Sequence, residues 1–366
     1  MLKTERIRQT TTLTWAASTA PAMDLDGVGL VTRYEMNVQL TPSATLVAAN
    51  QPDGLFRPVQ NLAIVAGGTQ YVGLPSEAGG EGGVLLHILN VVDRLGRGHP
   101  GVGVTAPQLS YTPVRFVIHC GVRPQRKDNI DNPFDLSAFI PASQVAGLQL
   151  TWTTPGNAVM DDVVTLSSAI LVVTANRVLG TEAEIMAEMA AQGIYDILPP
   201  GAKGMVPSWV GTLQSPTTTW AAYGLEVDAV LGGFLKRYTC VTQDATGTRP
   251  IRASDELTQL ALKLNDEGYD LLRVDTENLS GALPAIEQQG ADDAVPFGGA
   301  VAQGVYVVDL RPFGRNGSEL AYGRDLRGKP VGSVKWAQTV GTNAAGDDYL
   351  SLSERYIPWN ERLSNT

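Results

Sequence analysis

The side chains best suited to acid–base or metal chemistry are three histidines, His87, His99 and His119. No two of them have the spacing of metal ligands, such as H-x-H or H-E-x-x-H. The sequence has no G-x-S-x-G nucleophile motif. Its turns Gly27-Val28-Gly29 and Gly101-Val102-Gly103 lack the third glycine of a phosphate-binding loop. We therefore expect no catalytic residue, no cofactor and no enzymatic activity.

Carboxylates gather in a few loops. Asp128, Asp131 and Asp135 share one loop with two asparagines, and oxygen donors are the ligands that Ca²⁺ prefers. Their spacing is not that of an EF-hand, so solvated loop tips are the simpler interpretation. These three residues are weak candidates for a structural Ca²⁺ site. Paired acids, which could serve a glycosidase, occur at Asp161-Asp162, Asp292-Asp293 and Asp347-Asp348.

The charge of the chain argues against nucleic-acid binding. Its 366 residues carry a formal net charge of −10, whereas nucleic-acid binders carry a basic stripe that contacts phosphates. The basic cluster that exists is small: Lys3, Arg6 and Arg8. Charged residues make up 17% of the chain, below the roughly 25% usual for soluble domains. Because interface cores are depleted in charge, we expect much of the surface to be covered by partners.

The sequence also bears on the compartment. Its most apolar stretch, Ala169–Val173, is far shorter than the ~18 residues of a membrane-spanning helix. The N-terminus is charged and lacks the apolar core of a signal peptide. We expect a cytosol-like compartment, in which Cys120 and Cys240 are buried free thiols.

Strand signals dominate the pattern. Apolar and polar residues alternate from Val28 to Leu40, with Tyr34, Met36, Val38 and Leu40 as the apolar set. Gly- and Pro-rich loops separate further candidates. These are Leu62–Val65, Val114–Cys120, Leu148–Trp152, Val163–Thr174, Phe234–Thr242, Tyr269–Val274, Val305–Leu310, Val331–Val340 and Tyr349–Leu352.

Helix signals are few. Thr181 and Glu184 have the spacing of a capping box, which predicts a helix that ends at Gly193 and presents Ile185, Met186 and Met189 on one face. Two further helices are expected, over Asp255–Asn265 and Asn278–Gln288. The segment Gly83–Leu95 is ambiguous.

The two halves of the chain echo one another. Leu150-Thr151-Trp152 resembles Val334-Lys335-Trp336, and Leu-Ser follows 14 residues after each Trp, so both pairs are offset by 184 residues. Two looser echoes occur in the same order. They pair Thr32-Arg33-Tyr34 with Lys236-Arg237-Tyr238, and Val114–Ile118 with Val305–Val308.

This duplication predicts an all-β fold with a few short helices, made of two eight-stranded jelly-roll β-barrels side by side. Each half has roughly eight strand signals and long loops, which suit a jelly roll better than an immunoglobulin sandwich. We expect a first jelly roll with an N-terminal arm over residues 1–180. Residues 181–200 form a linker helix and a Pro-rich turn, and residues 201–366 a second jelly roll with a helical insert.

The chain resembles the double jelly-roll major capsid proteins of the adenovirus-hexon and tailless, membrane-containing bacteriophage lineage, and is most similar to the finnlakevirus type. The segments that carry the resemblance are Gly147–Trp152, Thr165–Val173, Gly304–Arg311 and Gly332–Trp336. The resemblance covers most of the chain in pattern and departs from the family in the expected helical insert.

The resemblance implies a structural role in a virion. Three chains would form a pseudo-hexagonal homotrimer, and trimers would tile an icosahedral shell with penton or minor capsid proteins, after assembly in the host cytoplasm. The helix from Thr181 to Gly193 would join or brace the barrels. Lys3, Arg6 and Arg8 would form an arm that faces neighbouring capsomers or an internal lipid membrane.

Two alternatives remain open at this point. One is another phage structural protein, such as a spike or tail component. The other is a carbohydrate-binding or carbohydrate-active β-sandwich, for which the six tryptophans would supply a stacking platform.

Overall fold

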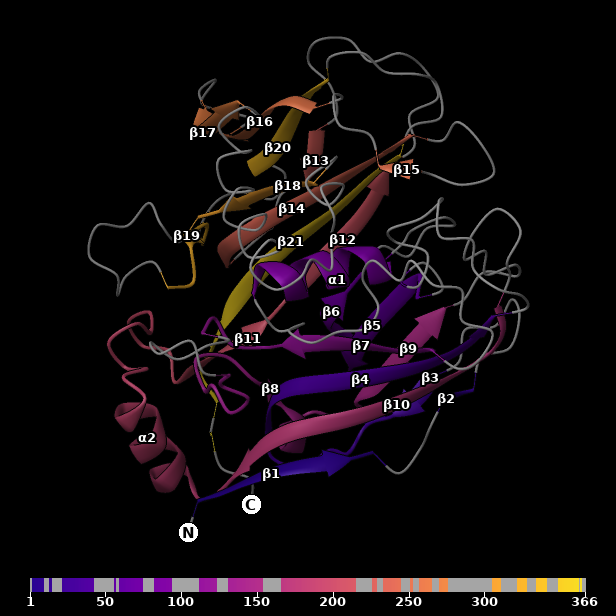
Figure 1. Cartoon of the computed structure of the whole chain (residues 1–366). Helices are drawn as coiled ribbons and strands as arrows, with labels where there is room; N and C mark the ends of the chain where they lie inside the picture. The colour runs from indigo at the N-terminus through magenta and orange to yellow at the C-terminus, as the bar shows by residue number, and fades with distance from the viewer. Residues whose placement is uncertain are drawn as a thin grey trace.

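The fold is built mainly of β-strands, and the residues described contain two α-helices (Figure 1). The structure is a computed structural model. It describes residues 2–9, 13–14, 22–42, 56, 59–74, 82–93, 112–123, 131–153, 166–214, 226–228, 233–244, 251–252, 257–264, 270–275, 305–310, 321–327, 334–340, 348–361 and 363. Within these ranges, no helix has the length and apolar character needed to span a membrane.

Ten strands lie in the described part of the first half of the chain. They are β1 (Lys3–Arg8), β2 (Leu13–Thr14), β3 (Ala22–Asp24), β4 (Leu30–Pro42), β5 (Asn61–Ala66), β6 (Thr69–Gly73), β7 (Thr112–His119), β8 (Ile140–Pro141), β9 (Gln149–Thr153) and β10 (Leu166–Leu179). One sheet has the order β1-β10-β4-β7, with β2 and β8 paired to β10 and β4. The facing strands have the order β3-β9-β5-β6.

The strands of the second half follow the same plan. They are β11 (Gly204–Pro207), β12 (Trp209–Gln214), β13 (Glu226–Asp228), β14 (Phe234–Asp244), β15 (Ile251–Arg252), β16 (Leu257–Leu264), β17 (Asp270–Asp275), β18 (Val305–Asp309), β19 (Arg324–Asp325), β20 (Val334–Val340) and β21 (Asp348–Trp359). Here β12, β21, β14 and β18 pair in that order, and a second sheet has the order β13-β20-β16-β17.

The pairings confirm the duplication. Strand β4 lies between β10 and β7 as β14 lies between β21 and β18, and β9 joins β3 to β5 as β20 joins β13 to β16. A β-bulge recurs at Thr32 on β4 and at Lys236 on β14, and the carbonyl oxygen of each accepts a hydrogen bond, from Cys120 N at 2.9 Å and from Leu310 N at 2.8 Å. In each half the two four-stranded orders make up the expected eight-stranded jelly roll, and the remaining short strands are additional.

One of the sequence echoes is wrong in register. Tyr34 lies opposite Ala175, and its counterpart Tyr238 lies opposite Ser353. Leu350 of β21 therefore corresponds to Val172 of β10, not to Leu166. The Leu-Ser pairs lie on equivalent strands but not at equivalent positions.

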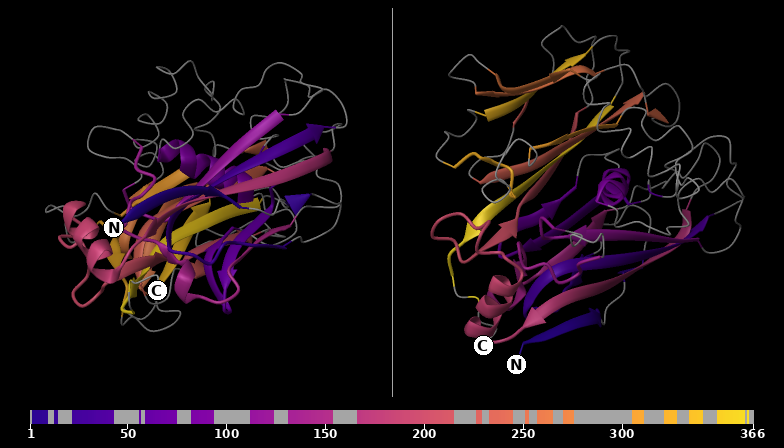
Figure 2. Two further views of the ribbon diagram at one scale, coloured as in Figure 1. Left: turned by 90° about the horizontal axis from the view of Figure 1, so that it is seen from below. Right: turned by 60° about the vertical axis from the view of Figure 1, so that its left-hand side comes forward.

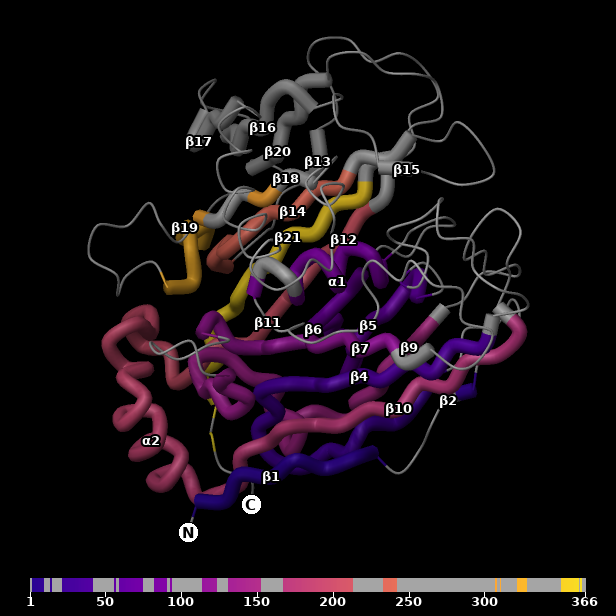
Figure 3. Tube along the Cα trace, in the orientation of Figure 1, coloured from indigo at the N-terminus to yellow at the C-terminus, as the bar shows by residue number. Residues whose placement is uncertain are grey.

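The two jelly rolls share one continuous sheet. Strand β12 of the second roll pairs with β6 of the first in parallel, through Trp209 opposite Val72 and Val210 opposite Gly73. The result is an eleven-stranded sheet that runs from one half into the other (Figures 1 and 3). All strands of the first roll precede the second helix of the chain, and β11 is the first strand after it.

The second helix, α2 (Glu182–Ala191), begins and ends as expected. Thr181 Oγ1 accepts a hydrogen bond from the Glu184 backbone N–H, and the Glu184 carboxylate accepts one from Thr181 N at 3.0 Å. Gly193 follows with a φ of +64°. Ile185 and Met189 are buried, whereas Met186 is 43% exposed. The prediction that Met186 shares a helix face with Ile185 and Met189 is therefore wrong. The reason is geometric, because residues four apart share a helix face more closely than neighbours do.

Two other helix expectations have different outcomes. The ambiguous segment near Gly83–Leu95 is a helix, α1 (Gly82–Val92). The helix expected over Asp255–Asn265 is wrong, because Leu257–Leu264 forms β16, which pairs with both β17 and β20. Its leucines, alanine and lysine favour a helix, and tertiary pairing overrides that propensity. The segment Asn278–Gln288 lies outside the described residues.

The ten strands expected from the sequence are all confirmed, as β4, β5, β7, β9, β10, β14, β17, β18, β20 and β21. The apolar face of β4 is buried in the core of the first roll, between the two facing sheets, where Trp152 also lies. The opposite face of β4 departs from the half-buried pattern, because Arg33 and Glu35 are buried as well.

Both cysteines are buried free thiols, as expected. Burial raises the pKa of Cys120 to about 12 and raises the pKa of Cys240 further. We predict that a thiol-specific reagent at pH 8 modifies neither cysteine in the folded protein and modifies two per chain after unfolding, since the thiolate is the reactive form. Rapid modification of either thiol in the folded protein would contradict the prediction.

Candidate functional site

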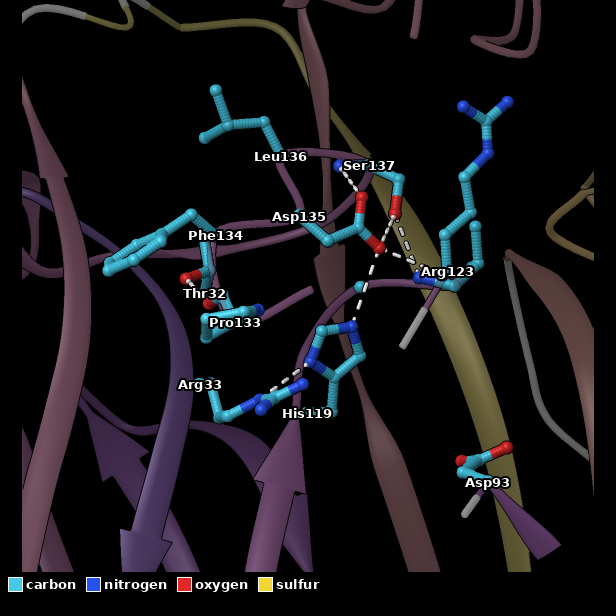
Figure 4. Close-up of polar contacts among 12 residues, drawn as sticks. Thr32, Arg33, Asp93, His119, Arg123, Pro133, Phe134, Asp135, Leu136 and Ser137 are labelled. Carbon is cyan, nitrogen blue, oxygen red and sulfur yellow. Dashed lines mark hydrogen bonds and ion pairs between the residues drawn. The ribbon is translucent and has the colours of Figure 1, made fainter. Parts of the chain in front are cut away.

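Two buried polar clusters surround equivalent arginines, one within the first jelly roll and one where the two rolls meet. The first surrounds Arg33, which is 1% exposed, on β4 (Figure 4). Arg33 Nε donates a hydrogen bond to His119 Nδ1 at 3.2 Å, and its two terminal nitrogens contact the Asp131 carboxylate at 2.7 and 2.6 Å. On the other side of the ring, His119 Nε2 lies 3.4 Å from Asp135 Oδ2. The bond from Arg33 fixes the tautomer of His119 that carries its proton on Nε2.

The Asp135 carboxylate is surrounded by donors. It accepts hydrogen bonds from Arg123 N at 2.8 Å and from the Ser137 hydroxyl at 2.7 Å. Glycine is needed at position 121, because a Cβ there would lie 2.1 Å from Asp135 Oδ2. The cluster thus closes tightly around one buried carboxylate.

This cluster contains the residue types of a Ser-His-Asp triad in the wrong arrangement. Nucleophilic catalysis requires the serine hydroxyl to donate to histidine and an open face for substrate. Here Ser137 donates to Asp135, and its oxygen accepts from Val122 N at 2.8 Å. Ser137, His119 and Asp135 are all buried. These hydrogen bonds hold the described residues between β7 and β8 in place. Their geometry does not suit acyl transfer.

The calcium candidates do not meet in one site within the described part of the chain. Asp131 is 59% exposed and pairs with Arg33, whereas Asp135 is buried and pairs with His119. The described residues contain no group of three or more His, Cys, Asp or Glu side chains that could hold a metal ion. Asp128, the pairs Asp161-Asp162 and Asp292-Asp293, and Asp347 lie outside the described residues, so a structural Ca²⁺ site stays a prediction.

The pKa values in this cluster follow from burial and pairing. Burial is the largest cause of the lowered pKa of His119, and the nearby Arg33 lowers it further, against the opposing effect of Asp135 and Asp93. Burial alone would raise the pKa of Asp135, but hydrogen bonds from His119 and Ser137 outweigh it and lower the pKa from 3.8. The cluster is thus a neutral His119 bonded to an ionised Asp135.

We predict that His119 makes the fold sensitive to mild acid. In the unfolded chain a histidine takes up a proton near pH 6.5, whereas the lowered pKa keeps folded His119 neutral. Stability is therefore lost as pH falls below about 6.5, with a slope of up to about 1.4 kcal/mol per pH unit. Asp135 contributes only below about pH 4, because its folded pKa is lowered from 3.8.

The measurement is urea unfolding of the wild type and of His119→Gln at pH 7.5, 6.5, 5.5 and 4.5. The other two histidines are present in both proteins, so the difference in slope isolates His119. Equal slopes for the two proteins would contradict the prediction.

The basic residues Lys3, Arg6 and Arg8 lie on an ordered strand. They are in β1, which pairs with β10 over six residues. Arg6, 63% exposed, contacts Glu35 at 2.5 Å, and Arg115 of β7 contacts the same carboxylate at 3.0 Å. Lys3 pairs with Glu5. The orientation of this strand in a shell stays a prediction.

The second cluster lies where the two rolls meet. Arg237 of β14, 0% exposed, contacts Glu354 of β21 and both oxygens of Asp93, each at 2.9 Å. Asp93 directly follows α1 and belongs to the first half of the chain. Lys236 contacts Glu354 at 3.3 Å and is also buried.

Apolar contacts extend this junction. Val122 and Ala138 of the first half pack with Phe234, Tyr322 and Tyr356 of the second. The Tyr322 hydroxyl donates a hydrogen bond to the Ser137 carbonyl oxygen at 2.6 Å. The helix α2 packs nearby with residues of both chain ends, Leu2 and Leu363 (Figure 2).

The sequence contains a signal for these clusters in the same echo that indicates the duplication. The echo of Thr32-Arg33-Tyr34 in Lys236-Arg237-Tyr238 places an arginine at the same position of each roll. Both arginines are fully buried, and an arginine is almost never fully buried unless it is paired. Asp131 lies 98 residues from Arg33 in the sequence, and Asp93 lies 144 residues from Arg237. The spacing of the residues could therefore not identify these ion-pair partners.

Comparison with solved structures identifies the fold. The crystal structure of the STIV MCP matches with a TM-score of 0.62 at 17% identity, over 97% of each chain. A chain in the atomic structure of Sulfolobus Turreted Icosahedral Virus gives 0.65 at 16% identity, over 97% of this chain and 91% of that chain. A chain of the PBCV-1 virus capsid gives 0.51 at 10% identity, over 97% and 94%. No family model matches the sequence, and no curated protein matches it significantly.

These matches define the class. Over nearly its whole length the chain has the double jelly-roll fold of viral major capsid proteins, as the sequence resemblance implied. Similarity to the STIV and PBCV-1 proteins is confirmed at the level of the fold, and similarity to the finnlakevirus type stays a prediction.

Proposed function

We propose that this chain is a viral major capsid protein that works by burying surface between subunits. The observation that carries the proposal is the two-roll architecture, which matches capsid protein structures from end to end with TM-scores of 0.62 and 0.65. The low content of charged residues supports it, because subunit interfaces are depleted in charge. The same matches do not favour a carbohydrate-binding sandwich.

The duplicated fold gives a physical reason for trimerisation. Three copies of a chain with two similar rolls present six similar units around one axis, which allows a threefold assembly to fill a hexagonal lattice position. A closed shell then follows from repeated contacts between such trimers. The buried polar clusters would hold each subunit rigid for this purpose, and no turnover is required of them.

We infer the remaining partners from this role. Neighbouring capsomers and penton or minor capsid proteins would contact the outer sides of the trimer in the virion, after assembly in the host cytoplasm. The strand that contains Lys3, Arg6 and Arg8 would face inward, toward those neighbours or an internal lipid membrane. Attraction of a basic side chain to anionic lipid is worth about 1 kcal/mol, and Glu5 and Glu35 already offset part of the charge.

The test is the solution mass of the purified chain by light scattering, with electron microscopy of the same fraction. We expect a mass near three times 38.9 kDa and particles with a three-sided or pseudo-hexagonal outline. A monodisperse species of 38.9 kDa that does not assemble at any concentration would contradict the proposal.

A further inference from the structure

The two jelly rolls contain the same buried arginine at the same position. Arg33 directly follows the bulge of β4 and lies opposite Asn176 of β10 and His119 of β7. Arg237 directly follows the equivalent bulge of β14 and lies opposite Glu354 and Asp309. The duplication therefore provides an internal control for what each arginine does.

The carboxylates that the two arginines grip with both terminal nitrogens come from different rolls. Arg33 makes its two-pronged ion pair with Asp131, which belongs to its own roll. Arg237 makes the same kind of pair with Asp93, which belongs to the other roll. The pair of the second roll thus crosses the junction between the two barrels.

Asp93 is a fixed point of the first roll. The preceding helix, α1, is buried through Val84, Leu85 and Leu89 in an apolar core that the first roll shares with strands of the second. Asn90 ties the helix to β7, since its amide donates to the Val117 carbonyl oxygen at 2.6 Å and accepts from Val117 N at 2.8 Å. The backbone N–H of Asp93 donates to Leu89 at 2.9 Å and so extends the helix.

The position of Asp93 is unfavourable for the helix itself. A carboxylate at a helix C-terminus meets the negative end of the helix dipole. The pair with Arg237 offsets this cost, so the acid is better explained by its contact across the junction than by its own helix.

The other contacts at the junction are of three kinds. The parallel pairing of β6 with β12 spans two residue pairs, single hydrogen bonds join Phe139 N to the Met205 carbonyl oxygen at 3.0 Å and Tyr322 to Ser137, and the neighbouring apolar cluster is non-directional. An arginine–carboxylate fork fixes direction as well as distance.

We propose that the buried cluster of Asp93, Lys236, Arg237 and Glu354 is a lock that sets the angle between the two jelly rolls. Two cations face two carboxylates in this cluster, and buried ionic groups of this kind can specify geometry more than they add stability. The consequence for a capsid rests on the proposed function: a wrong angle would spoil the hexagonal outline of the trimer.

The test compares Asp93→Asn with Asp131→Asn. Each variant removes the carboxylate from one of the two equivalent arginines, and only the first breaks a contact between rolls. We expect Asp93→Asn to broaden the distribution of interatomic distances that small-angle X-ray scattering gives for the subunit. We also expect this variant to reduce the yield of regular particles by about tenfold or more, which is the size of the effect of losing one strong ion pair. Asp131→Asn should leave the scattering profile and the particle yield near their wild-type values. Asp93→Glu should restore most of the particle yield.

The outcomes separate the lock from the proposed function. Unchanged scattering in Asp93→Asn, or equal changes in Asp131→Asn, would overturn the lock. If wild type forms no particles, the proposed function fails and the scattering comparison still decides the lock. If Asp93→Asn does not fold, Arg237→Lys takes its place, because lysine keeps the charge beside Glu354 but cannot form the fork; an unchanged profile in that variant would overturn the lock.

Discussion

Replacement of Glu354 by glutamine should lower the free energy of unfolding by about 3–5 kcal/mol. The side chain is fully buried and contacts both Lys236 and Arg237, which are themselves buried. Glutamine keeps the size of the side chain but removes one of the two carboxylate charges, those of Glu354 and Asp93, that compensate the two buried cations. Breaking a buried pair is far more costly than breaking an exposed one, because the remaining charge cannot return to water.

Urea unfolding of Glu354→Gln measures this effect, with the midpoint and slope fitted separately. The matched control is Asp325→Asn, which removes a carboxylate from the exposed pair with Arg327. An exposed pair contributes about 0–1 kcal/mol, so the control should unfold close to the wild type. A loss in Glu354→Gln no larger than in the control would show that the cluster tolerates an uncompensated charge.

Replacement of Trp152 by alanine should lower the free energy of unfolding by about 3–5 kcal/mol, the usual cost of removing a large buried aromatic side chain. Trp152 lies on β9 opposite Leu62 and is fully buried in the core of the first roll. Backbone hydrogen bonds hold the surrounding strands in place, so these strands can only partly fill the cavity that the removed side chain leaves.

Trp152→Phe is the control for this cavity. Among the residues that the structure describes, none bonds the buried indole Nε1 of Trp152, so phenylalanine removes volume and breaks no described hydrogen bond. We expect a loss of about 1–2 kcal/mol, smaller than for alanine. Equal losses for the two variants would mean that the indole edge, not the filled volume, stabilises this part of the core.

Local patterns explain why much of the fold could be expected from the sequence. The alternation along β4 depends on the two-residue period of a strand, and the capping box of α2 depends on residues three apart, so both are decided by near neighbours. The echoed tripeptides with Arg33 and Arg237 indicated a duplication for the same reason. They lie on strands that have equivalent neighbouring strands in the two rolls.

The sequence predictions that are wrong share one physical cause, which is that tertiary contacts override local sequence preference. The segment Leu257–Leu264 has helix-forming residues, yet two neighbouring strands convert it to a strand by supplying hydrogen bonds on both edges. The Leu-Ser echo was wrong in register because composition repeats more easily than strand pairing. Met186 was misassigned because hydrophobicity alone does not show which helix face meets a neighbour.

The sequence by itself determined ten of the strands, the capped helix between the halves, the buried thiols and the duplication, because each of these depends on residue types over short distances. Only the tertiary structure decided which charges meet. Asp131 reaches Arg33 within one roll, whereas Asp93 reaches Arg237 across the junction. It also decided that β6 and β12 join the two rolls in one sheet. These contacts join residues far apart in the chain, so their formation depends on how two folded barrels pack and not on any local pattern.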